Sequence, residues 1–299
     1  MANADPSSKE VNTESKKETT RKDSNIDYKN GSADVWDQLW KNQRYSDFLD
    51  DTTYVGVCEK IKFLSFRKSF SEAPGRKSLE CGCGLATMST MLAREGYHVT
   101  MLDLSAHALG NVKRSFEKLG LLGNFVQDDI NKMPFEDNSF DLVLSFGVLE
   151  HFEDIDRPIK EMVRVLRPNG IFFADIVPNK FSVHTIANII NYAMLSFNFI
   201  VKFKFIAGYR FFKNCGQRYY VNRCSLGDYI HAMKSEGLAE IKSGGYGPFP
   251  SFALPVCLNR IYLKFIKENT NVAIKFNLSV SNLARSIGFG WWVTGKKSS

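Results

Sequence analysis

The sequence is poor in cysteine and opens without a secretory signal, and both absences narrow the class of protein. Six cysteines in 299 residues are too few for a small disulfide scaffold. Cys81 and Cys83 have neither the two-residue spacing of a zinc site nor a histidine at ligand spacing, so we expect no metal. Without an apolar leader, the chain is predicted to be intracellular and cytoplasmic, with reduced thiols.

No stretch of the chain is apolar enough to predict a transmembrane helix. Residues 181–201 carry no formal charge over 21 positions, a length that could cross a bilayer. Serine, histidine and asparagine interrupt this stretch, however, and such groups are unfavourable in a membrane. Four basic residues follow between positions 202 and 213. We therefore interpret 180–222 as an inserted helical cap that binds substrate, and 181–213 as a candidate for peripheral contact with a membrane.

Acidic residues are scarce in the C-terminal two-fifths of the chain. The formal net charge of the whole chain is +7, whereas residues 180–299 contain 16 Lys and Arg against 4 Asp and Glu. A basic block of this kind indicates an anionic substrate, an anionic membrane surface or a nucleic acid. The alternative is a set of solvated lysines without a partner.

Large apolar side chains are also scarce in residues 1–33, so this polar tail is predicted to be disordered. An N-terminal helical segment is expected over 34–75, where Trp36, Leu39 and Trp40 have helical spacing. Residues 76–179 then alternate strands and helices, which is typical of a parallel sheet with crossover helices. Residues 223–299 are expected to complete the sheet.

The alternation predicts strands at about Lys77 to Cys81, Tyr97 to Leu102, Asn124 to Gln127, Phe140 to Ser145, Gly170 to Ile176 and Phe289 to Thr294. It predicts helices at Leu85 to Arg94, Ser105 to Leu119, Ile155 to Leu166 and Ser225 to Glu236. Ser105 is a plausible N-cap of the second of these helices, and Gly120 closes it.

The segment LECGCG, residues 79–84, ends the first strand and opens a helix. Glycines at this point let the backbone turn tightly and let a ligand approach it closely. A dinucleotide fingerprint would require a third glycine where Thr87 stands, so a pyrophosphate cradle is disfavoured. Asp103 ends the second strand and is placed to accept hydrogen bonds from a ribose diol, or else to cap the helix that follows. Asp128 and Asp129 follow the third strand, and an acid at this point can accept from an adenine amine, or else is an ordinary loop acid.

These elements lie in four segments that follow one another over residues 78–177: ECGCG, MLDLS, DDINKMPFEDNSFDLVLSFGVLEHF and EMVRVLRPNG. Together they resemble the class I S-adenosylmethionine-dependent methyltransferases, and most of all the small-molecule enzymes similar to those of ubiquinone and menaquinone biosynthesis. The resemblance implies a Rossmann-like α/β/α sandwich of seven mostly parallel strands. The last strand would be antiparallel, and the helical cap would be inserted after the fifth strand.

The resemblance also implies which residues bind S-adenosylmethionine. Glu80, Gly82 and Gly84 would line its methionine and ribose, and Asp103 would hold the ribose. The adenine side would be formed by Leu104, Asp129 and Ile130, and the methionine end by Ser145 and Phe146. The last glycine of the family's loop is replaced by Ala86, a small residue that is expected to fit.

His151 is the candidate base for a hydroxyl or enol, because imidazole titrates near neutral pH. The alternative is a polar contact that orients the loop or the cofactor. His184, Tyr219 and Tyr220 are weaker candidates from the cap. Trp36 and Trp40 are interpreted either as closing over the cofactor, since aromatic faces attract cations, or as packing an N-terminal helix on the sheet.

The fourth strand is followed by Ser145-Phe146-Gly147-Val148 and lacks the Asn/Asp-Pro-Pro-aromatic motif of enzymes that methylate adenine or glutamine amides. Oxygen or carbon methylation is therefore favoured, with a small amine as the remaining alternative. The cap, with its Phe, Ile and Leu beside Lys and Arg, suits a small apolar or amphiphilic acceptor with an acidic group, such as a quinone precursor, a phenol or a lipid-like molecule. The pattern specifies no oligomeric state.

Two other functions remain open at this point. An RNA or protein methyltransferase would dock through the basic C-terminal region, although the chain contains no recognised nucleic-acid-binding module, which disfavours nucleic acid as a partner. A non-catalytic partner subunit would bind the cofactor without turnover, and the intact cofactor residues argue against it.

Overall fold

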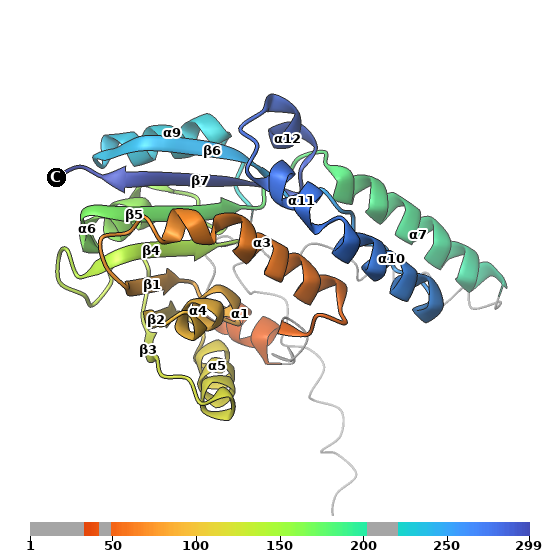
Figure 1. Ribbon diagram of the computed structural model, residues 1–299, viewed down its shortest axis with the longest axis horizontal. Helices are drawn as coiled ribbons and strands as arrows, with labels where there is room; N and C mark the ends of the chain where they lie inside the picture. The colour runs from red at the N-terminus through yellow and green to blue at the C-terminus, as the bar shows by residue number, and fades with distance from the viewer. Residues whose placement is uncertain (1–32, 42–48, 202–220) are drawn as a thin grey trace, which may run out of the picture.

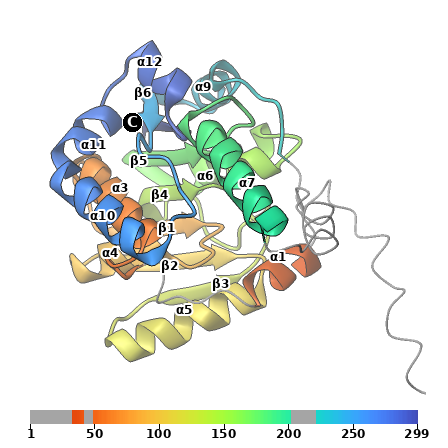
Figure 2. The same cartoon turned by 90° about the vertical axis from the view of Figure 1, so that its right-hand side faces the viewer.

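A seven-stranded sheet forms the centre of the computed structural model, which describes residues 33–41, 49–201 and 221–299. The strand order is β3-β2-β1-β4-β5-β7-β6, and helices cover both faces of the sheet (Figures 1 and 2). The strands are β1 (Lys77–Cys81), β2 (His98–Asp103), β3 (Asn124–Gln127), β4 (Phe140–Phe146), β5 (Leu166–Ile176), β6 (Leu238–Tyr246) and β7 (Gly290–Lys297). The predicted polar tail lies outside the described residues, save Ala33.

Strands β1 to β5 pair in parallel, and β7 lies antiparallel between β5 and β6. The predicted Rossmann-like sandwich with an antiparallel last strand is thereby confirmed. The central strands β1, β4 and β5 are buried along most of their length, because crossover helices cover both faces of a parallel sheet. Their carboxyl ends therefore point toward one edge, where such sheets form a crevice.

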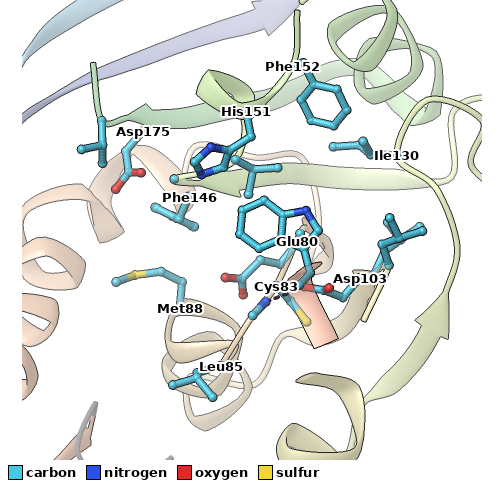
Figure 3. A pocket seen from close by; sticks show the side chains of 18 of the residues that line it. Glu80, Cys83, Leu85, Met88, Asp103, Ile130, Phe146, His151, Phe152 and Asp175 are labelled. Atoms are coloured by element: carbon cyan, nitrogen blue, oxygen red, sulfur yellow. Dashed lines mark hydrogen bonds between the residues drawn. The ribbon is translucent and has the colours of Figure 1, made fainter. Parts of the chain in front are cut away.

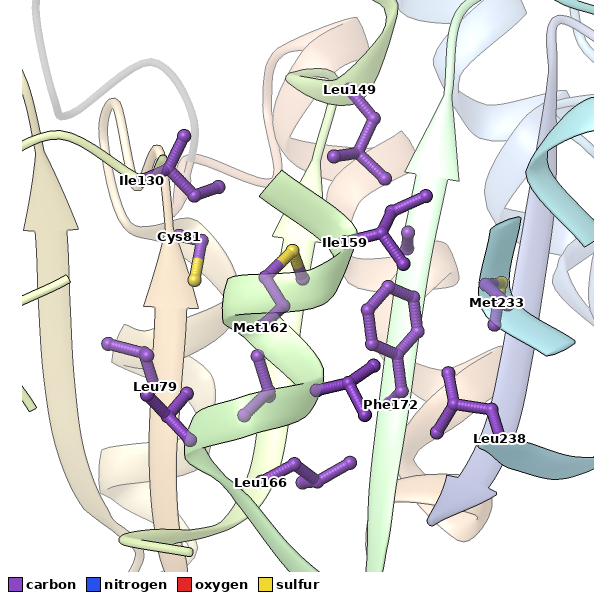
Figure 4. Close-up of a cluster of buried hydrophobic side chains, with 14 of the residues drawn as sticks. Leu79, Cys81, Ile130, Leu149, Ile159, Met162, Leu166, Phe172, Met233 and Leu238 are labelled. Carbon is purple, nitrogen blue, oxygen red and sulfur yellow. The ribbon is translucent and has the colours of Figure 1, made fainter. Parts of the chain in front are cut away.

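Helices α6 (Asp156–Val165) and α9 (Leu226–Ser235) cover one face of the sheet. Ile159 and Met162 of α6 pack with Leu79 of β1 and Phe172 of β5 in one buried cluster, which Met233 of α9 extends (Figure 4). Each of these side chains is 1% exposed or less, so complete burial contributes roughly 1.5–3 kcal/mol per side chain.

Helices α3 (Tyr54–Phe70), α4 (Thr87–Arg94) and α5 (Ala106–Leu119) contribute to a second buried cluster on the other face. Ser105 caps α5 by accepting from the Ala108 amide, and Gly120 ends it with a left-handed backbone, both as predicted. Helix α1 (Ala33–Trp40) contacts α5. The predicted helical segment over 34–75 thus contains α1 and α3, separated by residues 42–48, which lie outside the described part.

Helix α7 (Val183–Val201) follows β5 where the cap is predicted, and the remaining cap residues 202–220 lie outside the described residues. Three helices were not predicted: α10 (Val256–Glu268), α11 (Thr270–Asn277) and α12 (Asn282–Ile287) connect β6 to β7. Leu263 and Ile266 of α10 pack with Val57 and Ile61 of α3 in a third cluster. Residues 223–299 therefore complete the sheet but also build a helical layer against α3 (Figure 2). The proposed domain boundaries stay predictions.

Candidate functional site

A cavity of about 780 Å³ opens at the carboxyl ends of β1, β2, β4 and β5. Its volume lies in the range of small-molecule sites. Figure 3 shows Asp103 and Asp175 on opposite sides of this cavity, with His151 and Glu80 between them. Apart from Ser145, each cofactor-site residue predicted from the sequence lines it.

The loop after β1 forms a cradle that has no room for side chains. Gly82 and Gly84 have φ angles of +66° and +51°, which L residues with a side chain adopt only with strain. A Cβ on Gly82 would lie 2.6 Å from Val148, and one on Gly84 would lie 2.7 Å from the ring of Trp40. Ala86 also has a positive φ, +48°. This left-handed backbone explains why the family has a glycine at this position. In this chain, Ala86 adopts it at a cost of about 1–2 kcal/mol of strain.

Asp103 ends β2 and ties the glycine loop to the start of α5. Its Oδ2 accepts from the Gly84 amide at 2.8 Å, and its Oδ1 accepts from the Ser105 amide at 2.9 Å. Burial raises the pKa of this carboxyl, and these amide hydrogen bonds oppose the rise. A carboxylate has about four acceptor positions, so both oxygens can also accept from a ribose diol. The helix-capping alternative and the ribose prediction are therefore compatible.

Glu80, the penultimate residue of β1, is buried at the floor of the cavity. Its Oε2 accepts from the Ser89 amide of α4 at 2.9 Å. Burial raises the pKa of this carboxyl to about 7, against the lowering effect of the Ser89 hydrogen bond. Glu80 can therefore either donate or accept a hydrogen bond near neutral pH.

Leu104, Asp129 and Ile130 lie together on the cavity wall next to Asp103. The Oδ1 atom of Asp129 accepts from the backbone and side-chain amides of Asn131, so this acid also organises its own loop. Phe146 lines the cavity, whereas Ser145 is fully buried and its side chain does not reach the cavity. Successive side chains of a strand alternate between faces, and the assignment of Ser145 and Phe146 to the methionine end stays a prediction.

His151 lines the cavity from the short helix η2 (Leu149–His151) after β4. Its ring lies 4.9 Å from the ring of Trp36, measured between centroids. Trp36 and Trp40 of α1 both line the cavity as well, which agrees with helix α1 covering this site. The role of His151 as a base stays a prediction.

The weaker candidates lie elsewhere. His184 of α7 does not line the cavity; it packs on Phe289 at 4.2 Å and faces the Tyr54 hydroxyl at 3.4 Å. Burial lowers the pKa of His184. Tyr219 and Tyr220 lie outside the described residues.

A buried ionic cluster at the far end of the cavity was missed by sequence reasoning. Lys62 of α3 bonds the Oδ2 atom of Asp175, at the end of β5, at 2.9 Å, and Glu59 at 3.0 Å. Burial alone would lower the pKa of Lys62, but the two carboxylates outweigh it and raise the pKa, so Lys62 is a permanent cation. The Lys62 ammonium lies 5.5 Å from the Phe146 ring centre and 5.2 Å from that of Tyr246, distances typical of cation–π contacts.

Tyr246 ends β6 and belongs to the same end of the cavity. Burial, followed by the neighbouring Asp175, raises the pKa of its phenol well above the usual value. Its hydroxyl is therefore a neutral donor at every physiological pH. Lys62, Asp175 and Tyr246 come from three separate elements, and only the fold brings them together.

The lining of the cavity is strongly acidic. Among the described residues, the basic side chains of this lining are Lys62 and Arg157, and the acidic ones are Glu59, Glu80, Asp103, Asp128, Asp129, Glu153, Asp154 and Asp175. A concave site with an excess of carboxylates favours cationic ligands and disfavours anionic ones. Within the part of the chain that the structure describes, no basic residue of the C-terminal region lines the cavity.

A glycine loop and strand-end acids on an open parallel sheet define a Rossmann-like domain for a nucleotide-derived cofactor. Comparison with known families makes the assignment narrower: residues 79–174 match the model of a methyltransferase domain. Residues 79–174 are therefore recognised as a methyltransferase domain, in the region where the sequence resembles the class I S-adenosylmethionine-dependent enzymes.

Three curated relatives share this region. Sterol 24-C-methyltransferase ERG6B of Gibberella zeae is 39% identical over 33% of this chain and 27% of its own length. The ubiquinone/menaquinone biosynthesis C-methyltransferase UbiE of Brucella abortus is 35% identical over 34% of this chain and 40% of its own. Tocopherol O-methyltransferase of Arabidopsis thaliana is 26% identical over 48% and 46%. The chain thus spans less than half the length of each of these relatives.

Solved structures show the same fold at low identity. Phosphoethanolamine N-methyltransferase 2 of Haemonchus contortus, in complex with S-adenosylhomocysteine, aligns with a TM-score of 0.51 at 19% identity, over 87% of this chain and 61% of that one. A methyltransferase of Mesorhizobium loti aligns with a TM-score of 0.51 at 15% identity, over 79% and 98%.

The residues of this chain fit S-adenosylmethionine. The cradle at Gly82 and Gly84 excludes side chains and leaves backbone next to the cavity. Asp103 and Asp129 supply acceptors for hydroxyl and amine donors, and the acidic lining suits a sulfonium cation. The individual assignments of these residues stay predictions.

Proposed function

We propose that this protein transfers a methyl group from S-adenosylmethionine to an oxygen or carbon atom of a small amphiphilic acceptor. The observation that carries the proposal is the continuity of one cavity from the glycine loop and Asp103, at one end, to Lys62, Asp175 and Tyr246 at the other. One cavity can hold cofactor and acceptor in contact, and such positioning is the protein's main contribution to a displacement reaction.

When bound, S-adenosylmethionine supplies the electrophilic methyl group on a sulfonium. The chain's own residues position and desolvate the reactants. Asp103 and Glu80 hold the cofactor end, Trp36 and Trp40 exclude water from one side, and Phe146 separates the cofactor end from the ionic cluster. His151 is placed to accept a proton from the acceptor if the acceptor loses one.

The acidic lining changes the expected polar group of the acceptor. The sequence suggested an acceptor with an acidic group, but Asp175 and Glu59 leave the ionic cluster with more negative than positive charge. An anion brought beside these buried carboxylates would meet repulsion in a weakly screened site. A neutral hydroxyl can donate to Asp175 or to the phenol oxygen of Tyr246, so we assign a phenol, enol or alcohol to this end.

The reactions for which the relatives are named support a carbon or oxygen acceptor atom. Two of the three relatives are named as C-methyltransferases and one as an O-methyltransferase. Their named sterol, quinone and tocopherol chemistry combines an apolar body with a hydroxyl or carbonyl group. These are properties of the relatives, and their common pattern agrees with the cavity of this chain.

The test is a transfer assay with methyl-labelled cofactor and total cell extract, followed by partition of the label. Label in the organic phase, dependent on the protein, is the expected result. An Asp103→Ala variant serves as the control for cofactor-dependent transfer and should leave the organic phase unlabelled. Label in precipitated RNA or protein would overturn the small-molecule acceptor, and cofactor binding without transfer to any fraction would indicate a non-catalytic subunit.

A further inference from the structure

Helix α7 presents an apolar face to solvent that contains no charged residue. Ile186, Ile189, Ile190 and Met194 recur at the spacing of one helical face and are all exposed, Ile189 by 62%. The face turned to the protein carries Ala187, which is buried, and Asn191, which bonds the segment before α10. A soluble helix normally shows the reverse arrangement, with its apolar stripe turned to the core.

Helix α10 has an exposed apolar ridge beside a basic one. Leu258, Ile261 and Phe265 share one helical face and are at least 49% exposed. Arg260 and Lys264 lie on the adjacent exposed strip. Apolar and basic strips side by side on an exposed helix are the pattern of segments that lie in the headgroup region of a bilayer.

The basic strip of α10 includes a third residue, Lys267, and its ion pairs are weak. Lys267 lies on the same exposed strip and pairs with Asp51 at 3.6 Å, while Lys264 pairs with Glu268 at 3.8 Å. Arg260 makes no ion pair with any residue that the structure describes. Exposed pairs of this length are weak, so these cations remain available to an anionic surface.

The two helices are held together and project from the same end of the molecule. Asn191 of α7 donates to the Ser251 carbonyl and accepts from the Ala253 amide, in the segment that leads into α10. Figure 1 shows both helices extending past the sheet at the side toward which β1 and β4 point, and Figure 2 shows both facing the viewer from that side. This is the end of the sheet at which the cavity opens.

We propose that the exposed faces of α7 and α10 form a docking surface for an anionic lipid bilayer. Apolar side chains on both helices would enter the headgroup boundary, and the cations of α10 would contact acidic headgroups. Charge selects this occupant: α10 carries Arg260, Lys264 and Lys267 against the single acid Glu268. Among the described residues no helix is both long and apolar enough to cross a membrane, so the contact is peripheral.

The surface proposed here does not depend on the transfer reaction, because it can be measured as binding alone. It would nevertheless place the cavity mouth next to the bilayer, where a lipophilic acceptor is dissolved. Two other occupants of an apolar face, a second copy of this chain and a protein partner, are outcomes that the experiment distinguishes.

The experiment is co-sedimentation of the full chain with vesicles of phosphatidylcholine alone or with about 30% phosphatidylserine, a typical anionic mixture. We expect binding to the anionic vesicles, weakened at least tenfold by high salt or by Arg260→Glu with Lys264→Glu. The double variant Ile189→Asp with Ile261→Asp should lose binding at least tenfold, since it charges both helices. Melting temperature and S-adenosylhomocysteine affinity should stay at wild-type values, which separates this result from a folding or cofactor defect.

Leu122→Asp is the matched control. Leu122 is 90% exposed but lies before β3, at the other end of the sheet, so its variant should bind vesicles like wild type. Absence of binding to anionic vesicles, or binding that the double aspartate variant leaves intact, would overturn the proposal. A wild-type dimer in light scattering that the double variant converts to a monomer, together with no vesicle binding, would assign the face to a second copy instead.

Discussion

Replacing Lys62 with methionine should destabilise the protein strongly, because Lys62 neutralises buried carboxylates. Its ammonium lies 2.9 Å from Asp175, whose side chain is 1% exposed, and 3.0 Å from Glu59, whose side chain is 20% exposed. Methionine has a similar length and fills the same space, so the change removes charge with little loss of packing. Removing one partner of a buried ion pair costs about 3–5 kcal/mol.

That loss predicts a lower melting temperature and a lower midpoint of urea unfolding. In a chain of this size each kcal/mol corresponds to about 2 °C, so the melting temperature should fall by about 6–10 °C. The double variant Lys62→Met with Asp175→Asn should recover most of the loss, because it removes the carboxylate left without its partner.

Lys60→Met is the control, since Lys60 is exposed two residues earlier in α3, and its free energy of unfolding should change by less than about 0.5 kcal/mol. The assay is urea unfolding at pH 7, followed by circular dichroism for the four proteins. A loss below about 1 kcal/mol for Lys62→Met would refute the reasoning, since it is the size expected of a solvated pair. Failure of Asp175→Asn to restore stability would show that Asp175 is not the group that Lys62 neutralises.

Three further predictions concern the cofactor end, a buried acid and the candidate base. Asp103→Asn should weaken S-adenosylhomocysteine binding at least tenfold in calorimetry and lower the melting temperature, because Asp103 also holds the Gly84 amide; unchanged affinity would exclude a ribose role. Burial raises the pKa of Glu150 to about 8, so the folded state keeps a proton that the unfolded chain releases, and stability falls as pH rises from about 4.5 to 8. Glu150→Gln should therefore gain on the order of 1–3 kcal/mol over wild type at pH 8 and little at pH 5 in urea unfolding; parallel stability profiles would contradict this. His151→Asn should lower kcat by roughly 10²-fold or more and flatten its pH profile, with cofactor affinity retained; an unchanged profile would remove the base role.

The cofactor end could be predicted from the sequence because its signals are local. A strand followed by glycines, and acids at the ends of the next two strands, lie within 51 residues from Leu79 to Asp129. In a parallel sheet the carboxyl ends of successive strands meet at one edge, so spacing alone predicts that Gly84 and Asp103 lie together. The hydrogen bond between them at 2.8 Å is the direct consequence.

The buried ionic cluster at the far end of the cavity could not be predicted in this way, because its contacts join distant parts of the chain. Lys62 and Asp175 are 113 positions apart, and neither stands in a motif. Their meeting depends on α3 packing across the sheet, where Phe66 and Phe70 contact Phe173 of β5, while another side of α3 packs on α10. Helix α10 was not predicted because only Leu263 and Ile266 form its buried stripe, and its exposed face is also apolar. The sequence therefore shows no clear alternation of apolar and polar faces there.

The net charge of this chain differs in sign from the charge of the residues described as lining its cavity. A basic C-terminal region and an acidic cavity coexist because lysines are easily accommodated at the surface, while carboxylates at strand ends are held by backbone amides and buried cations. Asp103 is held by two amides and Asp175 by Lys62. We propose that the two charge patterns act on different partners: the exterior around α10 would attract an anionic surface, whereas the cavity would favour a sulfonium and a neutral hydroxyl. The basic composition therefore bears on which surface the protein would approach. The acids at the strand ends bear on which ligand would enter the cavity.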